Sequence, residues 1–92
     1  MTVYVDNMRM PARVGSINAK WSHLTADTKA ELHEFAQSIG LRREWFQEDA
    51  SFPTHWHYDV TDGKRALAIQ RGAVPIDIRE LFDVVHKEGR ET

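Results

Sequence analysis

Residues 55–65 read HWHYDVTDGKR, and this stretch predicts a strand that runs into a helix. Successive side chains of an extended segment point to opposite faces. Three polar side chains therefore share one face: His55, His57 and Asp59. Three apolar or aromatic side chains share the other: Trp56, Tyr58 and Val60. One face of the strand can pack in a core, and the other can hold a metal ion or a proton.

A helix is expected to follow this strand. Thr61 or Asp62 can cap its N-terminus, and its apolar positions extend as far as Arg71. Gly72 then supplies the glycine that often ends a helix.

Two further helices are predicted by capping boxes, in which the first residue and the residue three positions later satisfy each other's backbone N–H groups. Thr28 and Glu31 begin one helix, and Asp77 and Glu80 begin the last. The apolar residues that follow fall on one helix face: Leu32, Phe35, Ala36 and Ile39 in the first, and Ile78, Leu81, Phe82 and Val85 in the last. Gly40 ends the first of these helices.

Three shorter segments predict strands. Residues 2–5 are β-branched or aromatic and predict a first strand. Residues 42–47 predict a short strand that contains two aromatic residues. Residues 73–76 predict a strand at the edge of the sheet or the start of a strand, because Pro75 has no backbone N–H to donate within a sheet.

Residues 8–24 predict a long basic loop. Pro11 and Gly15 interrupt any period of 2 or 3.6, and three basic residues occur without an acidic one: Arg9, Arg13 and Lys20. A structureless connection of this length in a small domain is more often functional than idle. The loop is therefore a candidate lid or binding loop, and a surface excursion pinned by Trp21 is the alternative.

The order of strands and helices predicts a single α/β domain over residues 1–92. We expect a two-layer or three-layer sandwich with about three helices and a short, mainly parallel sheet. Ligands of such sheets bind beyond the carboxyl ends of the strands. Here these ends are expected at Asp6 and Asn7, at residues 61–64 and at Asp77.

The composition excludes several classes of site. Twelve basic and 14 acidic residues give a formal charge of −2, so no overall field drives binding to nucleic acid or to an anionic membrane. The absence of cysteine removes disulfides and thiolate ligands, and is compatible with a cytoplasmic location. No apolar stretch approaches the roughly 20 residues that span a bilayer. A chain of this length would gain stability as a homodimer.

The spacing His-x-His-x-Asp at residues 55–59 suits zinc or another divalent ion. The carboxyl end of the strand favours His57 and Asp59, and Asp6 would join them from the first strand. We therefore predict Asp6, His57 and Asp59 as ligands of zinc, manganese or magnesium. His23 can act as a general base, because imidazole titrates near neutral pH. An edge strand with solvated histidines is the alternative.

The N-terminus of the helix after residue 61 predicts an anion site, because its free N–H groups and its dipole attract negative charge. Gly63 permits close approach of a ligand. Four basic residues are predicted to bind a phosphate-bearing small molecule or nucleic acid: Arg9, Arg13, Lys64 and Arg65. A plain helix cap by Asp62 is the alternative.

Four sequence blocks carry a resemblance to a known family. They are Tyr-Val-Asp-Asn-Met-Arg at residues 4–9, Trp-Ser-His-Leu at 21–24, Trp-Phe-Gln at 45–47, and His-Tyr-Asp-Val-Thr at 57–61, with Lys64 and Arg65 beyond it. Together they are similar to domain-of-unknown-function family 4031, small proteins of bacteria and their phages. The resemblance spans nearly the whole chain. It implies a compact intracellular protein and brings no established activity.

The leading hypothesis is a polar site for a phosphate-bearing ligand. If the protein is an enzyme, metal-assisted hydrolysis is the expected class, with His23 as the base and with Arg9 and Lys64 stabilising developing negative charge. The alternative is a non-catalytic interaction or regulatory module. In that case three tryptophans would serve as packing or interface anchors: Trp21, Trp45 and Trp56.

Overall fold

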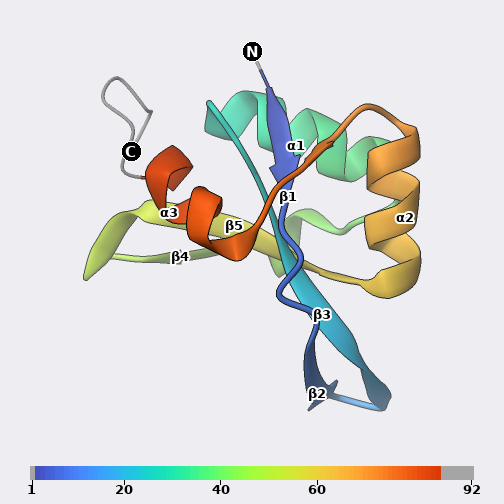
Figure 1. Ribbon diagram of the computed structural model, residues 1–92. Coiled ribbons are helices and arrows are strands. Elements are labelled where there is room, and N and C mark those ends of the chain that lie inside the picture. The colour runs from blue at the N-terminus through green and yellow to red at the C-terminus, as the bar shows by residue number, and fades with distance from the viewer. Residues whose placement is uncertain (1, 86–92) are drawn as a thin grey trace.

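The computed structural model describes residues 2–85 (Figure 1). In this part of the chain, six strands and three α-helices occur in the order β1 Val3–Val5, β2 Met10–Val14, β3 Ile17–Ala26, α1 Lys29–Ser38, β4 Gln47–Asp49, β5 Phe52–Thr61, α2 Asp62–Gln70, β6 Val74–Pro75 and α3 Ile78–Val85. A short 3-10 helix, η1, spans Arg43–Trp45 between α1 and β4. The predicted α/β class and the number of helices are confirmed.

The strands form a mixed sheet in the order β4-β5-β3-β1-β6, and β2 pairs with β3 outside this path. The prediction of a mainly parallel sheet is wrong, because β1 and β6 are the one parallel pair among the described strands. The reason lies in the connections. Two-residue turns join β2 to β3 and β4 to β5, and such turns can only return the chain antiparallel.

A β-hairpin occupies the segment for which the sequence predicted a long basic loop. Strands β2 and β3 project as a two-stranded ribbon away from the helices (Figure 1). Gly15 does not interrupt the strand period but turns the chain, with a φ of 61° that glycine adopts without strain. Pro11 has no backbone N–H to donate. It lies in β2, which pairs with β3 alone, so its nitrogen can face the unpaired edge of the sheet, where no donor is needed.

The strand predicted for residues 42–47 is wrong over most of its length, because η1 precedes β4. The backbone N–H of Trp45 donates to the carbonyl of Arg42, and that of Phe46 donates to Arg43, at 3.0 and 3.2 Å. This tight turn lets Phe46 pack against the core while the Trp45 ring stays half exposed beneath the Arg42 guanidinium.

The caps predicted at Thr28 and Gly40 and one of the two proposed for α2 are confirmed, whereas the Asp77 side chain accepts from the Arg79 N–H at 2.9 Å and not from the Glu80 N–H that a capping box would use. The Thr28 hydroxyl accepts from the backbone N–H of Glu31 at 3.2 Å. At the other end of α1, Gly40 has a φ of 84°, and the Leu41 N–H returns to the carbonyl of Ala36 at 2.9 Å. Of the two caps proposed for α2, Thr61 is the one used, since its hydroxyl accepts from the Lys64 N–H at 3.3 Å.

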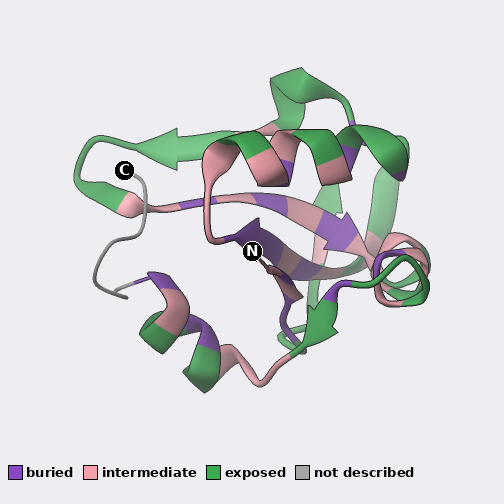
Figure 2. Ribbon diagram, turned by 90° about the horizontal axis from the view of Figure 1, so that it is seen from above, coloured by how far each residue is buried: buried purple, intermediate pink, exposed green. Residues whose placement is uncertain are grey.

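The two faces of the sheet differ as predicted for residues 55–60. Apolar side chains of the three central strands gather on one face: Val3, Val5, Leu24, Ala26, Trp56, Tyr58 and Val60. Helices α1 and α2 complete this core with Leu32, Ala36, Ile39 and Ala68. Figure 2 shows α1 and α3 on opposite sides of β5, which gives a three-layer arrangement. The polar face of β3 and β5 is therefore the one that α3 overlies.

In residues 2–85, no helix combines the length and the apolar character needed to cross a bilayer.

Candidate metal centre

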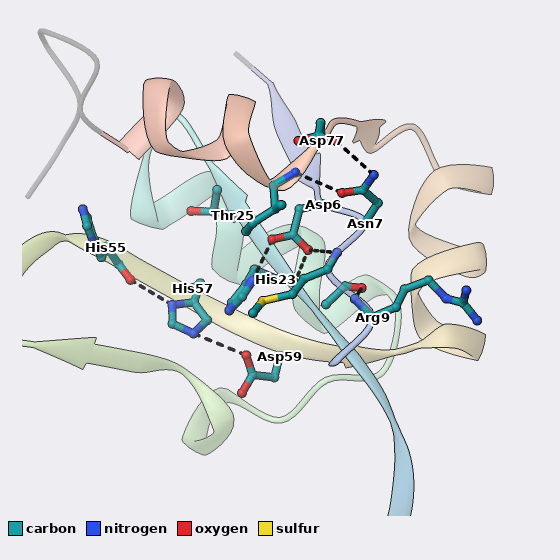
Figure 3. A network of polar contacts seen from close by, with 12 residues as sticks. Asp6, Asn7, Arg9, His23, Thr25, His55, His57, Asp59 and Asp77 are labelled. Carbon is teal, nitrogen blue, oxygen red and sulfur yellow. Dashed lines mark hydrogen bonds and ion pairs between the residues drawn. The ribbon is translucent and has the colours of Figure 1, made fainter. Parts of the chain in front are cut away.

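Three side chains converge on the polar face of the sheet (Figure 3). His23 comes from β3, and His57 and Asp59 come from β5. The antiparallel register pairs His23 directly with Asp59, so the three side chains point to the same side of the sheet. One candidate ligand atom from each lies within 4.8 Å of the others.

His57 is held by the backbone of its own strand. Its Nδ1 lies 2.8 Å from the carbonyl oxygen of His55. A carbonyl oxygen can only accept, so Nδ1 carries a proton; Nε2 then carries a second proton in the charged ring and a lone pair in the neutral ring. That Nε2 lies 3.3 Å from Oδ1 of Asp59.

Asp59 is fixed from two sides. Its Oδ2 accepts from the amide of Gln47 on the neighbouring strand β4 at 2.5 Å, while Oδ1 faces His57. Burial of the carboxyl group works against ionisation, but the hydrogen bonds from His57 and Gln47 outweigh it and lower the pKa of Asp59. Asp59 is therefore ionised at neutral pH and can serve as an anionic ligand.

His23 is oriented by Asp6. The carboxylate of Asp6 is fully buried, and its Oδ2 accepts from Nδ1 of His23 at 2.6 Å. Its Oδ1 accepts from the backbone N–H groups of His23 and Met8 at 2.9 and 3.2 Å. The hydrogen bond to Asp6 raises the pKa of His23, and partial burial opposes that rise. With Nδ1 engaged, Nε2 is the nitrogen that faces the centre of the cluster.

The two imidazoles therefore share one arrangement. In both rings Nδ1 donates to an oxygen, the Asp6 carboxylate or the His55 carbonyl, and Nε2 remains for a cation. Metal-binding histidines commonly donate their second N–H to a carboxylate or a carbonyl in this way. A neutral Nε2 of His57 and the Asp59 carboxylate would repel each other as two acceptors, so their 3.3 Å separation favours a positive charge at this point, either a proton or a metal ion.

The structure brings two of the three predicted metal ligands, His57 and Asp59, into this cluster. Asp6 lies behind His23 on its Nδ1 side, where it can orient the ring without reaching the centre. His23, predicted as a general base, occupies the third position of the cluster. The carbonyl of His55, rather than its ring, contributes by holding His57.

The four basic residues predicted to bind phosphate all have partners within the protein, and two of them, Arg9 and Arg65, lie close enough to Asp62 to lower its pKa. Each has a separate partner: Arg9 pairs with Asp62, Arg13 donates to the carbonyl of Gly15, Lys64 donates to that of Ile39, and Arg65 donates to that of Asp6. Lys64 thus closes the end of α1, and Arg65 supports the backbone of Asp6 from behind the cluster.

Comparison with known protein families matches residues 3–88 to the family described as "Protein of unknown function (DUF4031)". Neither a curated protein nor a solved structure matches the chain. The family match covers nearly the whole sequence, so the resemblance carried by the four sequence blocks is confirmed. The chain belongs to the DUF4031 family of proteins of unknown function.

Proposed function

We propose that this protein is a hydrolase that uses a divalent metal ion held by His23, His57 and Asp59. The observation that carries this proposal is the engagement of Nδ1 in both imidazoles, which leaves two Nε2 atoms and a carboxylate around one point. A purely structural histidine needs no such pairing with a second histidine and an ionised aspartate.

Zinc is the metal that this ligand set suits best. Two imidazole nitrogens and one carboxylate oxygen are typical ligands of zinc, whereas magnesium prefers oxygen ligands and retains several waters. Two ligand atoms of a tetrahedral zinc ion are about 3.3 Å apart, and the Nε2 of His57 lies 3.3 Å from Oδ1 of Asp59. Manganese is the second candidate among the predicted metals.

The number of ligands supports a catalytic role. Catalytic zinc sites use three protein ligands and keep a fourth position for water or substrate. All three side chains here remain partly exposed, so solvent can reach that position. A bound metal ion would supply a water molecule of lowered pKa for hydrolysis. In this proposal His23 serves as a ligand in place of the general base predicted from the sequence, and Asp6 holds it in position.

In a more specific form of this proposal, the substrate carries a phosphate group, as a nucleotide or nucleic acid does. Arg9 is the candidate for binding the phosphate, because its backbone N–H is held by Ser22, next to His23 in the sequence, although its side chain extends away from the cluster to Asp62 at the start of α2 (Figure 3). Its ion pair with Asp62 is exposed, and exposed pairs contribute little to stability. A phosphate group could therefore replace Asp62 at the Arg9 guanidinium at little cost.

Zinc content and ester hydrolysis test the proposal together. We expect the full-length protein, purified without a histidine tag, to bind one equivalent of zinc and to hydrolyse bis(p-nitrophenyl) phosphate or p-nitrophenyl acetate. His57→Gln and Asp59→Asn should lose both properties. His33→Gln is the matched control, because its imidazole contacts Tyr58 on the opposite face of the sheet, and it should retain them.

Equal zinc binding by wild type, His57→Gln and Asp59→Asn would contradict the metal centre. Stoichiometric zinc without turnover of either ester would leave the centre intact and reject the hydrolase. If only the phosphate ester is hydrolysed, and Arg9→Gln abolishes that turnover, the phosphate form is supported.

A second candidate, the interaction module, is favoured by the ribbon formed by β2 and β3. The register gives this ribbon one apolar face, with Met10 opposite Trp21, Ala12 opposite Ala19 and Val14 opposite Ile17. The side chains of Met10, Val14 and Ile17 are 50%, 56% and 51% exposed. An isolated two-stranded ribbon is marginally stable in water, and an exposed apolar face on it is typical of a contact surface.

The tryptophans contribute less to such a surface than the sequence suggested. Trp56 is completely buried in the core, so it cannot anchor a partner. Trp21 donates its ring N–H to the carbonyl of Ala12 across the ribbon and stiffens it. The ribbon face carries no charged side chain, so two copies could pack there without bringing like charges together, and a homodimer is the form of interaction that we propose.

A further inference from the structure

A small recess lies beside the proposed metal ligands, between α3 and the polar face of the sheet. Its volume is about 220 Å³. On one side, the imidazoles of His23 and His57 form part of the wall. The opposite side is built by α3, and the side chain of Met8 closes the recess further along.

Helix α3 supplies an apolar wall. Ile78, Leu81 and Val85 point inward at helical spacing, and Phe82 lines the same recess although it is 53% exposed. The start of the helix is fixed to the segment after β1 that carries Asp6, because the side-chain oxygen of Asn7 accepts from the backbone N–H of Ile78 at 3.0 Å (Figure 3). The wall is thus held in register with the residue that orients His23.

The recess offers little to a charged group. None of the described residues that line it is Lys, Arg, Asp or Glu. The hydroxyl of Thr25, which also faces it, donates to the carbonyl of Trp56 at 2.9 Å. A group that enters the recess therefore loses its contacts with water and gains contacts with hydrocarbon side chains and imidazole rings. This change favours binding of an apolar group and disfavours binding of an ionic one.

From this geometry we infer that the recess is a substrate subsite for a small apolar group. The ligand class is an ester that carries an aryl or short branched alkyl group within one or two bonds of the oxygen that meets the metal. A cavity of roughly 150 Å³ lined by aliphatic and aromatic side chains is large enough to bind benzene. The recess of about 220 Å³ is large enough for one such ring.

This inference rests on the proposed metal centre, and the test separates the two. The full-length protein is loaded with Co²⁺, whose visible absorption reports binding of a ligand to the metal. Acetohydroxamate and benzohydroxamate serve as probes, because both bind through the same oxygen atoms and differ in a methyl or a phenyl group. We expect benzohydroxamate to bind about 10- to 100-fold more tightly, the gain for moving a phenyl-sized group into apolar surroundings.

Two variants of the recess and one matched control complete the experiment. Met8→Ser and Phe82→Ser alter different parts of the wall, and each should reduce the preference for benzohydroxamate at least several-fold. Trp45→Ser removes a ring of similar exposure, 48%, that lines no part of the recess, and it should leave the preference unchanged. Comparing ratios between variants removes the intrinsic difference in metal affinity between the two probes.

The possible outcomes test the apolar subsite and the metal centre separately. If Co²⁺ binds and both hydroxamates bind with equal affinity, the subsite is overturned and the metal centre stands. If Co²⁺ does not bind, the metal centre is refuted and the subsite with it.

Discussion

Asp6 controls the proposed metal centre without touching the metal. Its carboxylate holds Nδ1 of His23 at 2.6 Å and is itself held by two backbone N–H groups. Replacing such an orienting carboxylate typically costs about 10- to 100-fold in metal affinity. We therefore expect Asp6→Asn to weaken zinc binding by about this factor, measured by competition with a chromophoric chelator.

Asp27→Asn is the control for this substitution, because Asp27 also accepts two hydrogen bonds, from the Thr2 N–H and the Tyr4 hydroxyl, yet lies outside the cluster. It should leave zinc affinity unchanged. Equal losses in the two variants would show that Asp6 acts only through general stability.

At the residue scale, part of the cluster was predictable and part was not. His57 and Asp59 lie two residues apart in one strand, so alternation alone places them on one face. The contact between Asp6 and His23 depends on the pairing of β1 with β3, and no sequence spacing encodes that register. For this reason Asp6 was predicted as a ligand and His23 as a base, where the structure places Asp6 behind His23.

The ends of α1 and α2 give opposite expectations for two glycines. Gly40 ends α1 with a φ of 84°, and a Cβ there would approach Lys64 Nζ at 3.0 Å. Gly63 lies inside α2, and its Cβ would meet only the Thr61 hydroxyl, at 4.0 Å. We expect Gly40→Ala to destabilise the protein by about 1–2 kcal/mol and Gly63→Ala to stabilise it by about 0.4–1 kcal/mol. Urea unfolding measures both, and equal effects would contradict this account of the caps.

The start of α3 should respond to acid at an unusually low pH. Hydrogen bonds from the Arg79 side chain and backbone, and from Asn7, lower the pKa of Asp77 to about 2. The pKa in the folded protein lies below the unfolded value of about 3.9, so the contribution of Asp77 is complete above that value and is lost as pH falls towards 2. A carboxyl titration by NMR should show a midpoint near 2. A midpoint near 4 would contradict the capping role.

Among the helices and strands, features encoded by residues close together in the sequence were predicted better than features that depend on pairing between strands. Helix caps are encoded within four residues: Thr28 and Gly40 were predicted correctly, and Thr61 was one of the two caps proposed for α2. The hairpin of residues 10–26 was missed although Gly15-Ser16 is a turn signal and apolar residues alternate on both sides of it. Pro11 and Gly15 were interpreted as breaks, whereas one lies in an edge strand and the other makes the turn.

For the molecule as a whole, the ribbon predicts self-association. Val14→Lys places a charge on the apolar face of the ribbon and should convert a dimer to a monomer in sedimentation equilibrium. Asn18→Lys adds the same charge on the opposite face, where Arg13 is its cross-strand partner, and should leave the dimer intact. Wild-type protein that remains monomeric at the highest concentration reached would reject this interface.

The arrangement of the whole sheet could not be predicted from the sequence, for a physical reason. Strand direction is decided by which strands pair, and β1 pairs with β3 and β6, neither of which its local sequence specifies. The predicted site at the carboxyl edge of a parallel sheet therefore gives way to a cluster on the face of a mostly antiparallel one. Two residues of the polar stretch at 55–59, His57 and Asp59, belong to this cluster, and the role of the stretch stays a prediction.

The central claim is that His23 and His57 offer Nε2 to one divalent metal ion while Nδ1 stays protonated. Long-range ¹H–¹⁵N correlation spectra of the histidine rings, recorded during a zinc titration, test it most directly. We expect both Nε2 signals to move to the values of metal-bound nitrogen at one equivalent of zinc, both Nδ1 atoms to keep their protons, and the His33 ring to be unaffected. Rings that do not respond to zinc, or that bind it through Nδ1, would contradict the account.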